Sequence, residues 1–185
     1  MSAVKYLSPR ISYKLTPEFT SIAISAKGER WKETLLMAWV LAWTASGLYF
    51  IFQLGADLPR DTKLAIVVLL FFWVYFEFQI GRALFWRLWG VELIRFSEGQ
   101  LSVKRSIKGY GKRMDYFLDN IAQFEVVERA PRSIVTVMED SFWVIGGERI
   151  AFEHLGRKVG VGLQISTEEA KKLRDLLEKQ RKKFV

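Results

Sequence analysis

The chain has 185 residues, with 28 lysines and arginines, 20 aspartates and glutamates, one histidine and no cysteine. Without cysteine there is no disulfide, thiol nucleophile, zinc–cysteine site or iron–sulfur cluster, and a single histidine excludes a multi-histidine metal site. The nucleotide-binding pattern Gly-x-x-x-x-Gly-Lys-Ser/Thr does not occur either. Since no group of residues resembles a catalytic site, we expect a protein that is not an enzyme and uses no cofactor or metal.

Charge divides the chain into three parts. Residues 1–32 carry 6 basic and 2 acidic groups, residues 33–89 carry 4 of each, and residues 90–185 carry 18 and 14. The neutral middle part also holds most of the aromatic residues. We therefore predict an N-terminal arm (1–32), a transmembrane helical hairpin (33–89) and a polar domain (90–185).

Two apolar runs make up the middle part. Residues 33–54 are uncharged after Glu33, and these 22 residues are enough to cross a bilayer core of about 30 Å as a helix. A buried helix of a soluble domain is the alternative, but such a helix is rarely apolar on every face. A short turn with Gly55 and Pro59 follows, and a second run extends from residue 64 to about residue 85. Two spans joined by so short a turn are antiparallel, which predicts a hairpin.

The charges that flank the hairpin predict its orientation. Six basic residues precede the first span, and Arg82, Arg87 and Arg95 follow or end the second. The connecting turn has only Arg60 and Lys63, which two aspartates balance. Because positive flanks stay on the cytoplasmic side, we expect a multi-pass protein of the inner (cytoplasmic) membrane with both termini in the cytoplasm.

After Gly90, apolar and polar residues alternate, which is typical of strands. A capping-box sequence from Ser166 to Glu169 then introduces a helix with an apolar stripe through Leu173 and Leu177. About seven short strands and one terminal amphipathic helix predict an α+β fold, a small barrel or sandwich capped by that helix. The strands are expected at residues 91–96, 101–107, 112–117, 121–128, 134–138 (with or without 142–145), 149–153 and 158–165.

Four runs of this domain have a distinctive combination of turns, strand ends and a helix cap. They are residues 89–105, Leu118-Asp-Asn-Ile121, residues 150–158 and residues 162–170. Together they resemble the bacterial pleckstrin-homology-like membrane proteins, and residues 22–27 are similar to the lead-in strand of that family. The resemblance covers about residues 20–183 and implies a membrane hairpin before a seven-stranded, helix-capped domain. Its motifs are structural, so it implies a fold and no activity; residues 129–147 fit it least.

One predicted turn of the domain is strongly basic. Lys104, Arg105, Lys108, Lys112 and Arg113 lie within ten residues that include no acid. One interpretation is a hairpin that binds anionic lipid headgroups, since each basic residue near such a surface contributes about 1 kcal/mol. The other is a solvated hairpin that lies near the membrane only because of its tether. The sequence leaves both open.

Glu77 lies inside the second apolar run, four residues after Trp73. An ionisable group at that depth is costly and indicates a specific contact. Trp39 and Trp43 are four residues apart, so they share one face of the first span. We expect Glu77 and these three tryptophans to contact a partner in the membrane. A contact of Glu77 with Thr44 or Ser46 of its own hairpin is the alternative, which a mid-membrane position of these two residues disfavours.

The leading hypothesis for function is a non-catalytic accessory or assembly subunit of a bacterial inner-membrane complex. It would dock on a larger integral membrane protein complex through its hairpin, its N-terminal arm and its domain. An arm such as residues 1–32 is ordered only when it docks on something, which favours such a complex. The alternative is a module that senses anionic lipids through residues 104–113. Membrane lipids are therefore expected partners, and nucleic acid is not.

Overall fold

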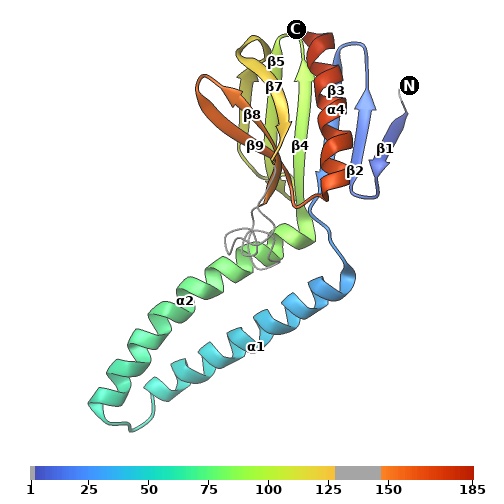
Figure 1. Ribbon diagram of the computed structural model, residues 1–185. Coiled ribbons are helices and arrows are strands. Elements are labelled where there is room, and N and C mark those ends of the chain that lie inside the picture. Colours follow the sequence, from blue (N-terminus) through green and yellow to red (C-terminus); the bar gives the residue numbers. More distant parts are fainter. Residues whose placement is uncertain (1–2, 128–146) are drawn as a thin grey trace.

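The computed structural model describes residues 3–127 and 147–185. A domain of two antiparallel sheets and one helix stands at one end, and two long helices extend away from it (Figure 1). The chain is therefore α+β with two apolar helices, as expected. The possibility of a closed barrel is wrong, because the strands of the described residues form separate sheets of six and three strands.

The larger sheet is antiparallel and keeps its strands in the order of the sequence. Its third and fourth strands pair over their whole length, from Phe19 opposite Ser97 to Ser25 opposite Val91. Residues 26–89, which include both long helices, are thus inserted between two neighbouring strands. The six strands are β1 (Val4–Ser8), β2 (Ile11–Leu15), β3 (Phe19–Ser25), β4 (Gly90–Ser97), β5 (Gln100–Ile107) and β6 (Arg113–Phe117).

Most of the predicted N-terminal arm belongs to this sheet. Of residues 1–32, those from 4 to 25 form three strands beside β4. Buried and partly exposed residues alternate along β3, and Ile11, Ile22 and Ile24 lie in the core of the domain. The arm therefore docks on its own domain, because its alternating apolar residues complete that core.

The smaller sheet contains three of the strands that the sequence predicted after residue 120. A 3-10 helix, η1 (Leu118–Asn120), leads from β6 into the first of them. Their ends agree with the predicted ones within two residues. The strands expected at 134–138 and 142–145 lie outside the described residues. The three strands are β7 (Ile121–Val126), β8 (Glu148–His154) and β9 (Arg157–Leu163).

The C-terminal helix, α4 (Thr167–Phe184), completes the core that the two sheets share. Its capping box is formed as predicted. The Ser166 side chain accepts a hydrogen bond from the Glu169 N–H, and the Glu169 carboxylate accepts one from the Ser166 N–H. Leu173 and Leu177 on the apolar stripe are fully buried. The helix is therefore fixed at its start by the cap and along its length by packing.

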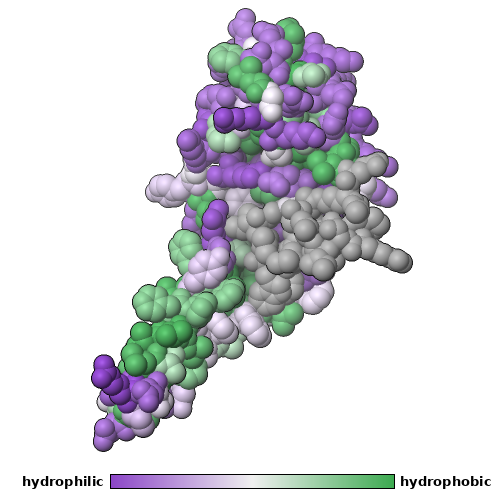
Figure 2. Space-filling view, turned by 60° about the vertical axis from the view of Figure 1, so that its left-hand side comes forward, coloured by the Kyte–Doolittle hydropathy of each residue, from purple (hydrophilic) through white to green (hydrophobic). Residues whose placement is uncertain are grey.

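The two long helices are apolar and largely exposed. α1 (Arg30–Leu54) and α2 (Arg60–Trp89) are long and apolar enough to cross a membrane, and only 11% and 6% of their most apolar stretches are buried. Figure 2 shows apolar surface along the hairpin and polar groups at its tip. The core helix of a soluble domain would bury such a surface, whereas these two helices leave most of it exposed.

Replacing Leu177 by alanine should lower the free energy of unfolding by about 2–5 kcal/mol, because it removes a fully buried side chain from the core. Thermal unfolding of the purified full-length protein, followed by circular dichroism, would show the lower Tm. Lys179→Ala changes an exposed position of the same helix and should leave the Tm nearly unchanged. A wild-type Tm for Leu177→Ala would contradict the placement of α4 in the core.

Candidate functional site

The basic turn between β5 and β6 lies at the end of the sheet from which the helices extend. Gly90, the first residue of β4, pairs with Ile107 at the end of β5. The backbone N–H of Lys108 donates to the carbonyl oxygen of Trp89, the last residue of α2, over 3.4 Å. The Lys108 ammonium lies 4.0 Å from the centroid of the Trp89 ring. The turn is therefore held beside the junction of α2 and the domain.

Arg105, one of the five predicted headgroup ligands, is directed into the domain. Its Nε donates to Glu92 Oε1 at 3.2 Å, and its Nη2 contacts Glu148 Oε1 at 3.1 Å. Nη2 also donates to the carbonyl oxygen of Gly160 at 2.8 Å. The guanidinium thus joins β4 and β5 of the larger sheet to β8 and β9 of the smaller one, and its role is structural.

The other four cations divide into two pairs. Lys104 donates to a carbonyl oxygen of the turn at 2.8 Å, and Arg113 pairs with Asp115 at 2.6 Å. In the part of the chain that the structure describes, Lys108 and Lys112 form no hydrogen bond or ion pair through their ammonium groups. Both are exposed. The turn therefore offers two available cations to an external anion instead of five.

Glu92 is a buried carboxylate that the sequence did not single out. Its Oε2 accepts hydrogen bonds from the backbone N–H groups of Gly162 and Leu163, at 2.8 and 3.1 Å. Burial raises the pKa of Glu92 above its ordinary value, and the charge of Arg105 and these hydrogen bonds oppose the shift only in part. Its signal in the sequence was an acidic residue at a position of the strand that alternates in phase with Ile94 and Phe96, but a lone acid in a strand is also the pattern of an exposed position.

The Glu77 carboxylate binds inside its own hairpin. The Thr44 hydroxyl donates to Glu77 Oε1 at 2.7 Å, and Trp73 Nε1 donates to the Trp43 carbonyl oxygen at 2.9 Å. The argument against the Thr44 contact is wrong. Thr44 lies 14 residues after the start of α1 and Glu77 lies 12 residues before the end of α2, so the two residues stand at similar levels of antiparallel helices.

The three tryptophans proposed as membrane contacts also differ in position. Trp39 and Trp43 share a face as predicted, with nearly parallel rings whose centroids are 6.4 Å apart. Trp39 is 49% exposed and Trp43 is partly buried. Trp73 packs between the helices against Gly47, where a Cβ would overlap its ring. Of the three, only Trp39 presents a large exposed surface.

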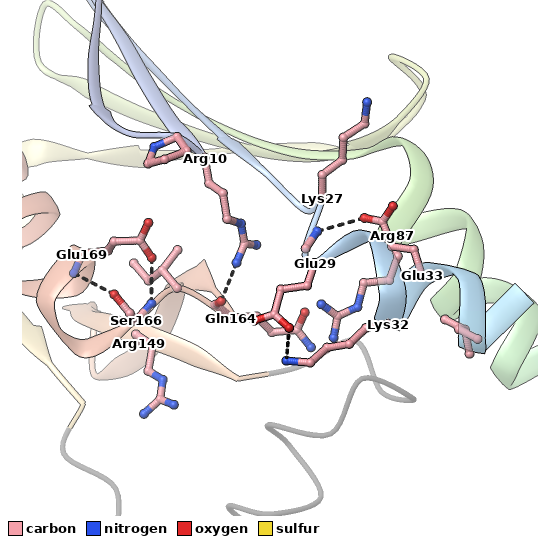
Figure 3. A pocket seen from close by; sticks show the side chains of 14 residues that line it. Arg10, Lys27, Glu29, Lys32, Glu33, Arg87, Arg149, Gln164, Ser166 and Glu169 are labelled. Atoms are coloured by element: carbon pink, nitrogen blue, oxygen red, sulfur yellow. Dashed lines mark hydrogen bonds and ion pairs between the residues drawn. The ribbon is translucent and has the colours of Figure 1, made fainter.

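A cavity of about 680 Å³ lies where the domain meets the ends of the two helices (Figure 3). Its walls come from the β1–β2 turn, the link from β3 to α1, the first turns of α1, the end of α2, the start of β8, the link from β9 to α4 and the first turn of α4. The charged side chains of its lining are five basic groups (Arg10, Lys27, Lys32, Arg87 and Arg149) and three carboxylates (Glu29, Glu33 and Glu169).

Arg10 reaches into this cavity from the β1–β2 turn. Its Nε and Nη2 donate to the Ser25 carbonyl oxygen at 3.1 and 3.0 Å, and its Nη1 donates to the Gln164 carbonyl oxygen at 2.9 Å. Burial lowers the pKa of Arg10 from its ordinary value, while the charges of Glu169 and Glu33 oppose this shift. Arg10 therefore joins the sheet to the start of α4 and brings a partly desolvated positive charge to the cavity.

Arg87 enters the cavity from the last turn of α2 (Figure 3). Its side chain is partly buried. In the described residues its guanidinium donates no hydrogen bond and forms no ion pair; it is attracted by Glu33 and repelled by Arg10. A guanidinium carries five N–H donors. Among the described residues, Arg87 is therefore a partly buried cation of this cavity without an acceptor.

The carboxylates of the cavity are already engaged. Glu33 Oε1 accepts a hydrogen bond from the Gly28 N–H at 2.9 Å, and Glu29 pairs with Lys32 at 3.0 Å. Burial by itself raises the pKa of Glu169, but hydrogen bonds from Ser8 and Ser166 and the charge of Arg10 together lower it below its ordinary value. Glu169 is thus held in its charged form, and the lining keeps a surplus of two positive charges.

Sequence reasoning did not find this cavity. Arg10, Glu33, Arg87 and Glu169 come from four separate elements, and no local pattern connects them. The only signal was a charge at the domain-side end of each apolar run. We interpreted these charges as marking the cytoplasmic side of the membrane, and that interpretation accounts for them without a cavity.

Comparison with known proteins adds no family to these observations. A scan against protein-family models finds no match to this chain, and a search of curated proteins finds none either.

The raised pKa of Glu92 predicts a pH-dependent contribution to stability. The contribution is full below the unfolded carboxyl pKa of about 4.3 and is lost as the pH rises through the folded pKa. Arg105, and through it Glu148, are the charged groups that face Glu92. The Tm of the wild type minus that of Glu92→Gln, measured by thermal unfolding, should therefore fall as the pH rises above about 4.

The control for this measurement is Glu153→Gln, which removes an exposed carboxyl from β8. Its Tm difference from the wild type should not follow the same course. A difference for Glu92→Gln that stays constant or grows with pH would show that Glu92 is not destabilised by burial in its charged form.

Proposed function

We propose that this protein is a non-enzymatic, two-span protein of a bacterial inner membrane whose cytoplasmic domain binds the anionic membrane surface. One observation carries the proposal: the two available cations of the basic turn, Lys108 and Lys112, lie at the same end of the domain as two exposed apolar helices. If the helices cross the bilayer, this end of the domain faces the headgroups. Each available cation near an anionic surface contributes about 1 kcal/mol.

The dimensions of the helices support the membrane part of the proposal. At 1.5 Å per residue, α1 is about 37 Å long and α2 about 45 Å, against a hydrocarbon core of about 30 Å. The surplus length lies mainly at the domain end, where Trp31, Trp86 and Trp89 are found. Tryptophan prefers the interface between lipid and water, and the basic residues around it favour the cytoplasmic side.

The resemblance to the bacterial pleckstrin-homology-like proteins stays part of this proposal. It is supported by a hairpin attached to an antiparallel domain whose C-terminal helix closes the core. The domain differs from the expected seven strands, since β1 and β2 extend its larger sheet.

The orientation can be tested with single cysteines, because the chain has none of its own. Cysteines at Asp57, in the tip of the hairpin, and at Glu98, in the β4–β5 turn, replace exposed residues. In intact cells an impermeant maleimide should label Asp57→Cys alone, and both variants should react after permeabilisation. Labelling of Glu98→Cys in unbroken cells would overturn the cytoplasmic placement of the domain.

The surface contact can be tested with an environment-sensitive dye on Tyr110→Cys, a position in the basic turn that is 86% exposed. In nanodiscs, about one-third anionic lipid should shift the emission to the blue relative to neutral lipid, and high salt should reverse the shift. Lys108→Glu with Lys112→Glu should abolish it.

The matched control is the dye on Leu155→Cys, in the β8–β9 turn, which is 73% exposed. This turn follows His154, which pairs with Ile121 at the end of the sheet away from the helices. Its emission should not depend on the lipid. Equal emission from Tyr110→Cys in anionic and neutral nanodiscs would contradict the proposed contact.

The accessory-subunit function remains a second candidate, and the open edge of β1 favours it. In the described residues β1 pairs only with β2, and the side chains of Val4, Lys5 and Tyr6 are exposed. An unpaired edge strand can accept a strand from another protein. The observation that first suggested a partner, Glu77 without a contact, supports it only in part, because Thr44 donates to Glu77 Oε1 while the buried Oε2 has no partner among the described residues. Purification in mild detergent without any other subunit would count against this candidate.

A further inference from the structure

We propose that the cavity between the domain and the helix ends binds the phosphate of one anionic phospholipid, with Arg87 and Arg10 facing that phosphate. The inference rests on the proposed membrane orientation, but it does not depend on the basic turn. It concerns one lipid molecule bound in the cavity, whereas the basic turn between β5 and β6 would contact many headgroups of the membrane surface.

The first argument is the depth at which the cavity would lie in the membrane. About 20 helical residues cross the hydrocarbon core, so a span that starts near Lys63 reaches the opposite boundary near Ala83. Arg87 follows one turn later, at the depth of the headgroups. On α1, Lys32 and Glu33 stand at the start of the apolar run and line the same cavity. The cavity therefore opens where lipid phosphates lie.

The second argument is that the guanidinium groups of Arg87 and Arg10 have N–H donors that no described residue uses. Arg87 is partly buried and has no acceptor among the described residues. Arg10 uses three of its five N–H groups on the carbonyl oxygens of Ser25 and Gln164, which leaves two. A phosphate between the two guanidinium groups would accept these hydrogen bonds and remove their mutual repulsion. Both side chains enter the same cavity (Figure 3).

The charge of the lining decides the class of ligand. Five cations and three carboxylates leave a surplus of two positive charges, which suits one phosphate group better than the larger negative charge of a nucleoside triphosphate or a polyphosphate. The lining also includes Leu36, a buried apolar residue of α1 that begins the apolar run below the cavity. A ligand with a phosphodiester head and an apolar body meets both features. We therefore assign the site to a lipid such as phosphatidylglycerol, and not to free phosphate.

The test titrates the purified full-length protein, in mild detergent, with phosphatidylglycerol and counts bound lipids by native mass spectrometry. The wild type should retain one lipid tightly, and phosphatidylcholine should not replace it. Arg87→Gln should weaken this binding about tenfold or more, as expected for the loss of charge-assisted hydrogen bonds. The matched control is Arg82→Gln, which removes the same charge from an exposed position of α2 outside the cavity and should bind as the wild type does.

Three further arms make the outcome decisive. Lys108→Glu with Lys112→Glu should keep the tightly bound lipid, so the site and the basic turn can fail separately. Wild-type-like Tm values for both arginine variants would show that they are folded. The proposal is overturned if Arg87→Gln binds phosphatidylglycerol as the wild type does, or if the wild type retains no lipid. Binding of glycerol phosphate as tight as that of the lipid, with the same dependence on Arg87, would assign the site to a free phosphate and refute the lipid.

Discussion

The pairing of β3 with β4 is the constraint on which the rest of this structure depends. These strands are neighbours in the sheet although residues 26–89 separate them in the chain. Because the strands are antiparallel, the chain leaves the sheet at the end of β3 and returns to it at the same end. Both long helices must therefore attach to the domain at this same end, because the strand pairing fixes the two points of attachment. The cavity, the basic turn and the tryptophans of the junction all lie at that end as a consequence.

Some basic side chains of this protein are bound within the fold, and others are available to bind an external anion. Arg105 is held by Glu92, Glu148 and a carbonyl oxygen, and it joins two sheets that share few other polar contacts in the described residues. Of these groups only Glu92 is fully buried, so removing the Arg105 guanidinium would leave a buried carboxylate without its counter-charge, which is costly. Lys108 and Arg87 make no comparable hydrogen bonds or ion pairs. A cation that the fold does not use is a better candidate for binding an external anion than one that holds two sheets together.

In the hairpin, some polar groups find partners within the pair of helices, whereas the buried Glu77 Oε2 and Trp43 Nε1 have none among the described residues. Lipid tails supply no hydrogen bonds, so a buried polar group in a span needs a protein acceptor or donor. Glu77 meets Thr44, and the Trp73 indole meets a carbonyl oxygen of α1. Gly47 lets the Trp73 ring approach the helix closely. The outer faces of the two helices are mostly apolar and exposed.

The sequence by itself determined the elements whose signals are local. Two uncharged runs predicted both helices, the capping box predicted the start of α4, and alternation predicted β4, β5 and β9, because burial on one face repeats along neighbouring residues. For the region of β3 the only prediction was a lead-in strand at residues 22–27, which came from the family resemblance, and its pairing with β4 across the hairpin was not predicted. Only the tertiary structure decided this pairing and the hydrogen bond of Arg105 to the buried Glu92. It also decided that Thr44 lies opposite Glu77 and that Arg10 lies near enough to Arg87 to repel it. Each of these joins residues far apart in the chain, and such contacts depend on how the complete core packs and not on any local pattern.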